Sequence, residues 1–316
     1  MTHSLPPMSG LSGASSAAPT LPLGPRRGRL HAAIVTVRPR QWTKNLLVIA
    51  AAGAAGALGH DDVPLRVGLA FLAFCLLAAG TYAINDVRDA AEDRLHPRKC
   101  LRPVAAGELA PAAALRLGVA LMVAGLALCI AIRPLLGLVG AGYLALTLSY
   151  AVLWRRIVIL DIVAIAGGFV LRAVAGGVAA PVTLSRWFIV VITCAALLVA
   201  AGKRYAELTR TDAAGLAKRP VLHLYTPSRL RLILTASGAG ALFAYCVWAF
   251  ELPTVDGVPW RPLTIIPFAA ALLRYGQLVL RGEGEAPEDL ALRDRWLALA
   301  TIVWLIVFAI GVQVST

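Results

Sequence analysis

The stretch LAFLAFCLLAAGTYAINDVRDAAEDRLHP, residues 69–97, joins a hydrophobic run to a cluster of charged side chains. The run extends from Pro64 to Ile84, and about 20 apolar residues form a helix long enough to cross a bilayer. Directly after it come four carboxylates, on Asp86, Asp89, Glu92 and Asp93. A cluster of acids where a membrane helix ends predicts a site at the membrane surface.

The rest of the chain repeats this hydrophobic pattern. Of 316 residues 59% are hydrophobic and 15% are charged, and the mean hydropathy is +0.76. Soluble domains are nearer half apolar and about a quarter charged. Membrane strands would alternate over about ten residues, so the unbroken runs predict an all-α polytopic membrane protein with nine transmembrane helices. The nine predicted segments are 43–59, 65–84, 112–132, 135–153, 157–179, 186–201, 229–250, 262–280 and 296–313.

Residues 1–28 are rich in Pro, Ser, Gly and Ala, which is typical of disorder. They contain no apolar run followed by a cleavage site, so we predict a disordered cytoplasmic tail and not a signal peptide. The remaining residues, 29–316, are expected to form one transmembrane catalytic domain. The five cysteines are scattered without a C-x-x-C pair, which favours small core residues over disulfides or zinc ligands.

The distribution of basic residues predicts the orientation. With a cytoplasmic N-terminus, 23 Lys and Arg residues fall on the cytoplasmic side and four on the other. The positive-inside rule therefore predicts a multi-pass protein of the cell (inner) membrane with its N-terminus in the cytoplasm and its C-terminus outside. The net charge of +13 lies in loops between membrane segments, so we expect lipid head groups and phosphorylated substrates as partners, and no nucleic acid.

The acidic stretch has the spacing of a metal site. Asn85, Asp89 and Asp93 are spaced by four and stack on one helical face, which Asp86 joins. Like charges at this spacing repel, and a divalent cation would remove the repulsion. Oxygen ligands beside open solvent suit Mg²⁺, so all four are predicted metal ligands and catalytic residues. The alternative is a solvated helix end whose acids pair with nearby arginines.

These residues resemble a known family. An N-D-x-x-D-x-x-x-D motif at the end of the second predicted helix is similar to that of the UbiA superfamily of intramembrane prenyltransferases. The resemblance implies that Mg²⁺ on this motif holds a diphosphate at the cytoplasmic face. One branch, the decaprenyl-phosphate phosphoribosyltransferases, is resembled more closely, over residues ~38 to 210. The stretches that carry this resemblance are RPRQWTKN (38–45), residues 85–109, GFVLRAVAGGVA (168–179) and AGKRYAEL (201–208).

One stretch departs from the superfamily pattern. Most members have a second aspartate motif after the sixth helix, where this chain has GKRYAELTRTD, residues 202–212. A basic pair suits a phosphate that is held without metal, so Lys203, Arg204 and the adjacent Tyr205 are predicted to bind substrate. The alternative is that the two basic residues only anchor a helix end at the membrane interface.

Taken with the resemblance, this departure predicts the reaction. We expect transfer of 5-phosphoribose from phosphoribosyl diphosphate to a polyprenyl (decaprenyl) phosphate, for synthesis of a cell-wall arabinan precursor. The resemblance also implies a homotrimer. The alternatives are a UbiA-type aromatic or quinone-precursor prenyltransferase and a non-enzymatic lipid transporter, although transporters place polar groups near the midplane and here the charge lies at one face.

Further basic and polar residues at the cytoplasmic ends of helices are predicted to bind substrate, although each could instead anchor the protein at the interface. They are Gln41, Lys44, Lys99, Arg102, Arg155 and Arg156. Two charges fall within the fifth predicted helix, where a charge is costly. For Asp161 the expected partner is Arg155 or Arg156, and for Arg172 we expect a structural partner.

Overall fold

The computed structural model describes residues 28–60, 62–153, 157, 159–214, 224–251, 258–284, 289–290 and 293–315. The predicted tail, apart from its last residue, lies outside these ranges, as do Arg155 and Arg156.

The regular elements of the described chain are α-helices and short 3₁₀ helices, which confirms the all-α prediction. Eight helical segments of the described residues are long and apolar enough to cross a membrane. The protein is therefore a multi-pass membrane protein. The helices that form these segments are α3 (Val63–Arg88), α5 (Pro111–Ile132), α6 (Pro134–Val152), α7 (Leu160–Ala179), α8 (Arg186–Ala214), α9 (Pro227–Phe250), α10 with α11 (Trp260–Leu263 and Ile265–Leu280) and α13 (Arg295–Ser315).

The first predicted segment, 43–59, does not form one straight helix. After the short helix α1 (Arg29–Val37), the chain forms a 3₁₀ helix, η1 (Pro39–Leu46), then α2 (Leu47–Ala54) and a last 3₁₀ turn, η2 (Ala57–Gly59). The regular helix ends before Gly56, which adopts a left-handed conformation with φ of 70°. The prediction of a continuous helix here was wrong, because the polar residues of η1 lie in what was predicted to be the helix start.

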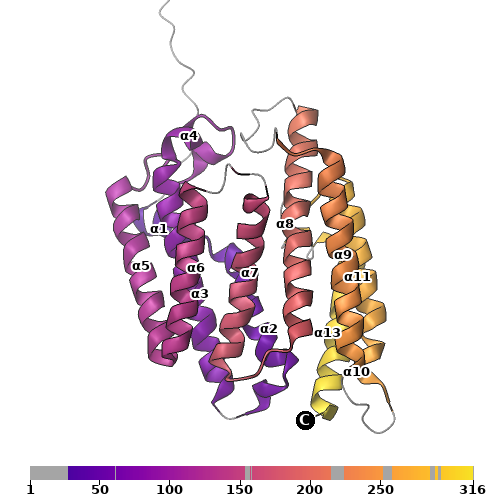
Figure 1. Ribbon diagram of the computed structural model, residues 1–316. Coiled ribbons are helices and arrows are strands. Elements are labelled where there is room, and N and C mark those ends of the chain that lie inside the picture. The colour runs from indigo at the N-terminus through magenta and orange to yellow at the C-terminus, as the bar shows by residue number, and fades with distance from the viewer. Residues whose placement is uncertain are drawn as a thin grey trace, which may run out of the picture.

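The helices stand side by side in an upright bundle (Figure 1). The earlier helices α3, α5, α6 and α7 form one half, and α8, α9, α11 and α13 form the other. α3 and α7 are central, since 61% and 56% of their membrane windows are buried, against 17% for α5, α11 and α13. α4 (Ala90–Arg94) lies at the upper end of the bundle and the C-terminus at the lower end (Figure 1).

Prolines and glycines shape the bundle. Pro111, Pro134 and Pro227 each occupy the first turn of a helix, where a missing N–H costs no hydrogen bond. Gly80 of α3 faces Gly118 of α5 so closely that a Cβ on Gly80 would lie 2.6 Å from the Gly118 carbonyl oxygen. The absence of side chains at these two positions lets the helix backbones touch.

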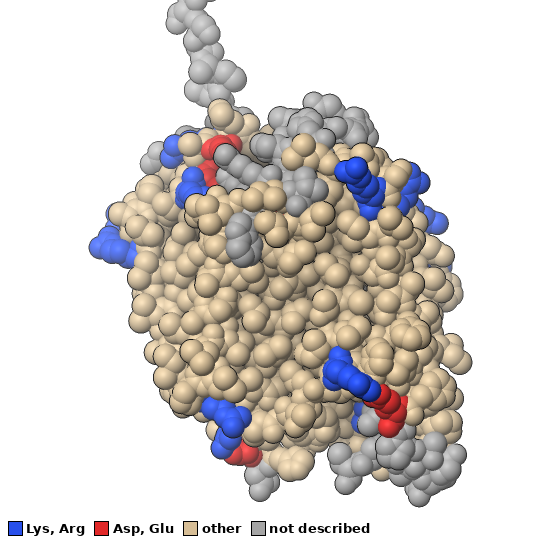
Figure 2. Space-filling model, viewed as in Figure 1, with Lys and Arg blue, Asp and Glu red and all other residues tan. Residues whose placement is uncertain are grey.

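Charged side chains gather towards the two ends of the molecule, on the face drawn in Figure 2, and the coloured surface between them is largely uncharged. An uncharged middle zone of this kind is expected of a surface that faces lipid. The end that carries α4 also carries the acidic stretch, so the predicted site lies at an end of the bundle.

Candidate active site

The acidic residues lie where α3 passes into α4. Regular helix is interrupted at Asp89, yet the backbone bonds continue: Asp89 N–H donates to the Asn85 carbonyl at 2.9 Å, and Asp93 N–H to the Asp89 carbonyl at 2.8 Å. The helical stacking that was predicted for Asn85, Asp89 and Asp93 is therefore retained in the backbone.

Two arginines hold the buried carboxylates of this cluster. Arg38 donates a hydrogen bond to Asp86 Oδ1. Arg102 places Nη1 2.6 Å from Asp93 Oδ2 and 3.3 Å from Asp86 Oδ1, so it bridges the two acids. The acidic side chains are 2% and 4% exposed, and the arginines 23% and 28%. Asp86, Asp93, Arg38 and Arg102, which we call the four-charge cluster, are thus neutral in sum.

Asp89 contacts a different arginine, Arg88. Its Oδ1 lies 3.2 Å from Nη2 of Arg88, and both side chains are partly exposed. In the described part of the chain, no three His, Cys, Asp or Glu side chains converge closely enough to hold a metal ion. The side-chain oxygen of Asn85, by contrast, is buried without a hydrogen-bond partner. A buried carbonyl oxygen of this kind needs a donor or a cation, and it lies next to Asp86 in the sequence.

The 3₁₀ helix η1 approaches the cluster from the N-terminal side. Arg38, which precedes η1, has a left-handed backbone conformation with φ of 52°, and its guanidinium lies 5.2 Å from the ring centre of Tyr82 on α3. Gln41 and Lys44 are both half-buried on η1. Arg38 is only three residues before Gln41. The same short segment therefore carries the predicted ligand Gln41 and one arginine of the four-charge cluster.

Asn45, at the buried end of η1, is tied to α7. Arg172 donates to Asn45 Oδ1 at 2.7 Å, to the Tyr143 hydroxyl at 2.8 Å and to the Gly168 carbonyl at 2.7 Å. The prediction that Arg172 has structural partners is confirmed. These bonds fix the irregular first segment against α6 and α7.

The second basic stretch has a different environment from the one expected. Arg204, which is 1% exposed, donates to both carboxylate oxygens of Asp161, to Glu207 Oε2 at 2.6 Å and to the Tyr150 hydroxyl at 3.0 Å. Its guanidinium is therefore satisfied by protein groups. Lys203, the neighbouring residue, is half-buried. Tyr205 is 8% exposed and belongs to an apolar core cluster.

Asp161 thus pairs with Arg204. Ile159, just before α7, is held by Tyr225. The hydroxyl of Tyr225 accepts a hydrogen bond from the Ile159 N–H at 3.0 Å. Burial raises the pKa of Tyr225, so its hydroxyl stays neutral at physiological pH. The buried ion pair and this tyrosine together join the upper ends of α6, α7, α8 and α9.

Lys99 and Arg102 lie on the loop after α4, as predicted, and Arg102 reaches the acids. The predicted ligands Arg155 and Arg156 lie outside the described residues. The sequence did not single out Arg38, Asn45, Tyr143 or Tyr150. For Arg38 and Asn45 a signal existed, since both belong to the RPRQWTKN stretch.

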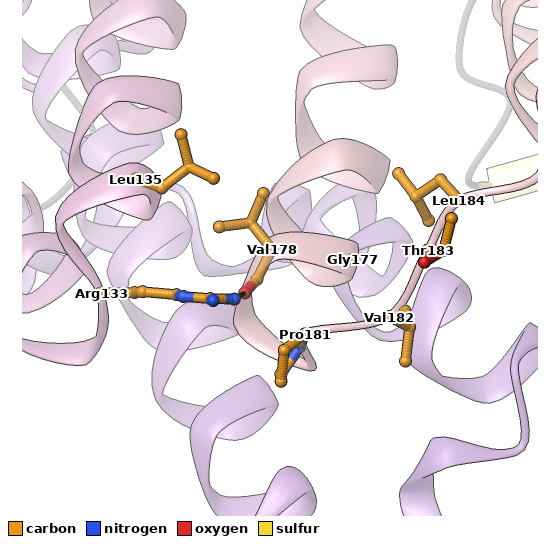
Figure 3. A pocket seen from close by; sticks show the side chains of 8 residues that line it. All are labelled: Arg133, Leu135, Gly177, Val178, Pro181, Val182, Thr183 and Leu184. Carbon is orange, nitrogen blue, oxygen red and sulfur yellow. Dashed lines mark hydrogen bonds between the residues drawn. The ribbon is translucent and has the colours of Figure 1, made fainter.

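A hollow of the described surface lies at the other end of the bundle. It has a volume of ≈ 260 Å³ and is lined by Arg133 and Leu135 at the start of α6, and by residues 177–178 and 181–184. Arg133 points across it and donates to the Val178 carbonyl at 3.1 Å (Figure 3). It contains no acidic side chain and is remote from the four-charge cluster, so it is not the candidate active site.

Comparison with known proteins identifies the family. Residues 46–299 match the UbiA prenyltransferase family. The decaprenyl-phosphate phosphoribosyltransferase of Mycolicibacterium smegmatis is 41% identical, with 89% of this chain and 92% of that protein covered. The enzyme of the same name from Mycobacterium tuberculosis is 40% identical, with 86% and 91% covered.

A solved structure supports the fold. A UbiA homologue from Archaeoglobus fulgidus, bound to GPP and Mg²⁺, superimposes with a TM-score of 0.64 at 18% identity, over 90% of this chain and 99% of that chain. The helical bundle, the acidic stretch at its end and the sequence match agree, and the chain belongs to the UbiA prenyltransferase family.

Proposed function

We propose that the protein transfers 5-phosphoribose from phosphoribosyl diphosphate to decaprenyl phosphate and releases diphosphate. The observation that carries this proposal is the identity of about 40% over most of the chain with decaprenyl-phosphate phosphoribosyltransferases. The arrangement of charges at the upper end of the bundle supports it, because buried acids and several basic side chains gather there beside a lipid-facing surface.

Asn85, Asp86, Asp89 and Asp93 would hold Mg²⁺. The types of donor fit this ion, since they are hard oxygen ligands and include the unpartnered buried oxygen of Asn85. Because no three acids of the described chain converge in this structure, the carboxylates would have to move together to bind it. When bound, Mg²⁺ supplies positive charge that stabilises the departing diphosphate. Binding of the ion would place its charge beside Arg38 and Arg102, which pair with Asp86 and Asp93 in this structure.

The basic residues near the acids then bind anionic groups. Lys99 and Arg102, on the loop after α4, suit the phosphates of the donor, and Gln41 and Lys44 approach from η1. Lys203 is our candidate for the phosphate of the lipid. We assign Arg204 a structural role, because Asp161 and Glu207 already pair with it. Tyr205, Arg155 and Arg156 remain predicted ligands.

The chemistry makes few demands on side chains as acids or bases. A phosphate oxygen of the lipid attacks the anomeric carbon of ribose, and the bond from that carbon to the diphosphate oxygen breaks. The phosphate is anionic at neutral pH, so no general base is required. The transition state resembles an oxocarbenium ion, and positive side chains around the leaving group lower the barrier. In-line attack inverts the anomeric centre.

The pairing of the described acids near α8 argues against an aromatic prenyltransferase. Such an enzyme would need carboxylates near the end of α8 for a second metal. Asp161 and Glu207 lie there, but both are engaged by Arg204. The described residues near α8 thus favour one metal site and one site for a bare phosphate.

We also propose nine membrane crossings with the acidic end in the cytoplasm. Eight residues of 3₁₀ helix and eight of α-helix span about 28 Å at 2.0 and 1.5 Å per residue, close to the hydrocarbon thickness. α1 lies in the upper part of the bundle and α2 in the lower part (Figure 1), which supports a crossing by this broken segment. The predicted disordered tail, the homotrimer and the cell-membrane location also belong to this proposal.

One assay tests the function. Membranes that contain the protein are incubated with radiolabelled phosphoribosyl diphosphate, decaprenyl phosphate and Mg²⁺, and the lipid fraction is analysed for label. We expect a labelled phosphoribosyl lipid that disappears with EDTA. Parallel reactions with a prenyl diphosphate and an aromatic acceptor distinguish the alternative. Turnover in those reactions, with no labelled lipid in the first, would contradict the proposal.

A further inference from the structure

The four-charge cluster raises a problem for metal binding. Asp86 and Asp93 are almost fully buried, and each already has an arginine within ion-pair distance. The arginines contact Oδ1 of Asp86 and Oδ2 of Asp93, so a bound cation would lie beside two positive guanidinium groups. If a divalent cation entered with both arginines in place, the buried cluster would carry a charge of about +2, which a partly desolvated site disfavours.

We propose that Arg38 and Arg102 exchange partners when the donor binds: each leaves the carboxylates as the metal arrives and pairs with the phosphates of the donor. This inference rests on the proposed function. In the resulting complex the cation is bound by the two acids and the donor diphosphate, and the two arginines pair with phosphate oxygens. Every positive group then has a negative partner. Metal and donor then favour each other's binding, and the metal alone binds poorly.

The geometry supports this exchange. Arg102 contacts both acids through one nitrogen, Nη1, so one movement of its guanidinium would release Asp93 and leave Asp86 paired with Arg38 alone. Arg38 and Arg102 are the more exposed members of the four-charge cluster, at 23% and 28%, so their guanidiniums can reach a ligand that enters from solvent. An arginine fork also matches phosphate oxygens as well as it matches a carboxylate.

Arg38 has a further property that suits a movable group. It adopts φ of 52°, an uncommon conformation for a residue with a side chain, at the junction between α1 and η1. η1 carries Gln41 and Lys44, which we assign to the donor. Arg38 directly precedes η1, so its movement towards the donor would bring it to the same ligand as Gln41 and Lys44.

The test compares two affinities that the exchange moves in opposite directions. Binding of Mn²⁺ alone to purified protein is measured by electron paramagnetic resonance. Binding of radiolabelled phosphoribosyl diphosphate is measured in saturating Mg²⁺. For Arg38→Gln and for Arg102→Gln we expect Mn²⁺ to bind about tenfold tighter or more, because a competing positive charge is gone, and the donor to bind about tenfold weaker or more.

The controls separate this exchange from other effects. Arg94→Gln removes the arginine that ends α4, which donates to the Ala105 carbonyl at 3.3 Å, and should leave both affinities unchanged. Arg38→Lys keeps the charge and should keep Mn²⁺ binding close to that of the wild type. If one glutamine variant fails to fold, the other still tests whether the Mn²⁺ affinity rises while the donor affinity falls.

Two results would overturn the proposal, and they differ in what else they affect. The first is unchanged or weaker Mn²⁺ binding in the folded glutamine variants, which would contradict the exchange. If Asp86→Asn loses Mn²⁺ binding in the same experiment, the assignment of the metal site would still stand. Wild-type Mn²⁺ binding by Asp86→Asn would instead show that the metal binds elsewhere, and both the metal site and the exchange would fall.

Discussion

Asp161 in the first turn of α7 receives hydrogen bonds from both Nε and Nη2 of Arg204 on α8, and each side chain is about 1% exposed. Nη2 lies 2.7 Å from Asp161 Oδ1, and the Tyr150 hydroxyl donates to the same oxygen at 2.8 Å. This buried pair joins three helices at the end of the bundle where the site lies. The guanidinium of Arg204 is therefore engaged by protein groups, which is why we propose a structural role for it.

Arg204→Met should destabilise the protein by about 3–5 kcal/mol, because it leaves the Asp161 carboxylate buried without its cation. The free energy of unfolding, or the midpoint of thermal unfolding in detergent, measures this loss. The double variant Asp161→Asn with Arg204→Met removes both charges and should recover much of it. A stable Arg204→Met protein with a specific loss of affinity for the lipid would contradict the structural role.

Lys203→Ala should impair use of the lipid phosphate and leave stability nearly unchanged. Loss of a charge-assisted hydrogen bond to a phosphate costs about 1.5–3 kcal/mol, which is roughly ten- to hundredfold in affinity. Saturation curves that vary each substrate separately measure the effect. A defect confined to phosphoribosyl diphosphate would mean that the two phosphate sites are assigned the wrong way round.

Asp89→Asn should abolish turnover without unfolding the protein. The change keeps the side-chain shape, removes one charge from the proposed metal ligands and relieves repulsion among the acids. Glu92→Gln, an exposed residue of the next helical turn, is the matched control and should retain activity. Full activity of Asp89→Asn in saturating Mg²⁺ would rule out Asp89 as a required ligand.

Gly176→Ala should disturb the packing of α7 on α2. A Cβ at this position would overlap the backbone carbonyl of Val48, which cannot move aside like a flexible side chain. Overpacking of this kind typically costs about 1–3 kcal/mol. Gly276→Ala on α11 is the control, because a Cβ there meets no atom within 4 Å. Equal thermal stability of the two variants would show that α2 adjusts freely.

Cysteine labelling tests the proposed orientation. Leu95 is 89% exposed on the loop after α4, and His60 is exposed at the other end of the bundle. In a Cys100→Ser background, Leu95→Cys should react with an impermeant thiol reagent only after the cells are opened, whereas His60→Cys should react in intact cells. The reverse pattern would place the acidic end outside the cell.

The sequence by itself determined the helical membrane class, the position of most helices and the family. Runs of about 20 apolar residues have few ways to satisfy their backbone in lipid, so hydropathy specifies helices without knowledge of their neighbours. The acidic spacing and the stretch that begins at Arg38 are likewise local patterns, and they sufficed for the resemblance that the comparisons bear out.

Tertiary structure decided which charges neutralise one another. Arg38 is 48 residues from Asp86, and Arg204 is 43 residues from Asp161, so no local pattern pairs them. The sequence presented Lys203 and Arg204 as equivalent neighbours. In the fold, the packing of α7 on α8 turns Arg204 into the interior, where a buried guanidinium must find carboxylates. The irregular first segment has a similar origin, because Arg172 and Gly176 of α7 fix where η1 and α2 can lie.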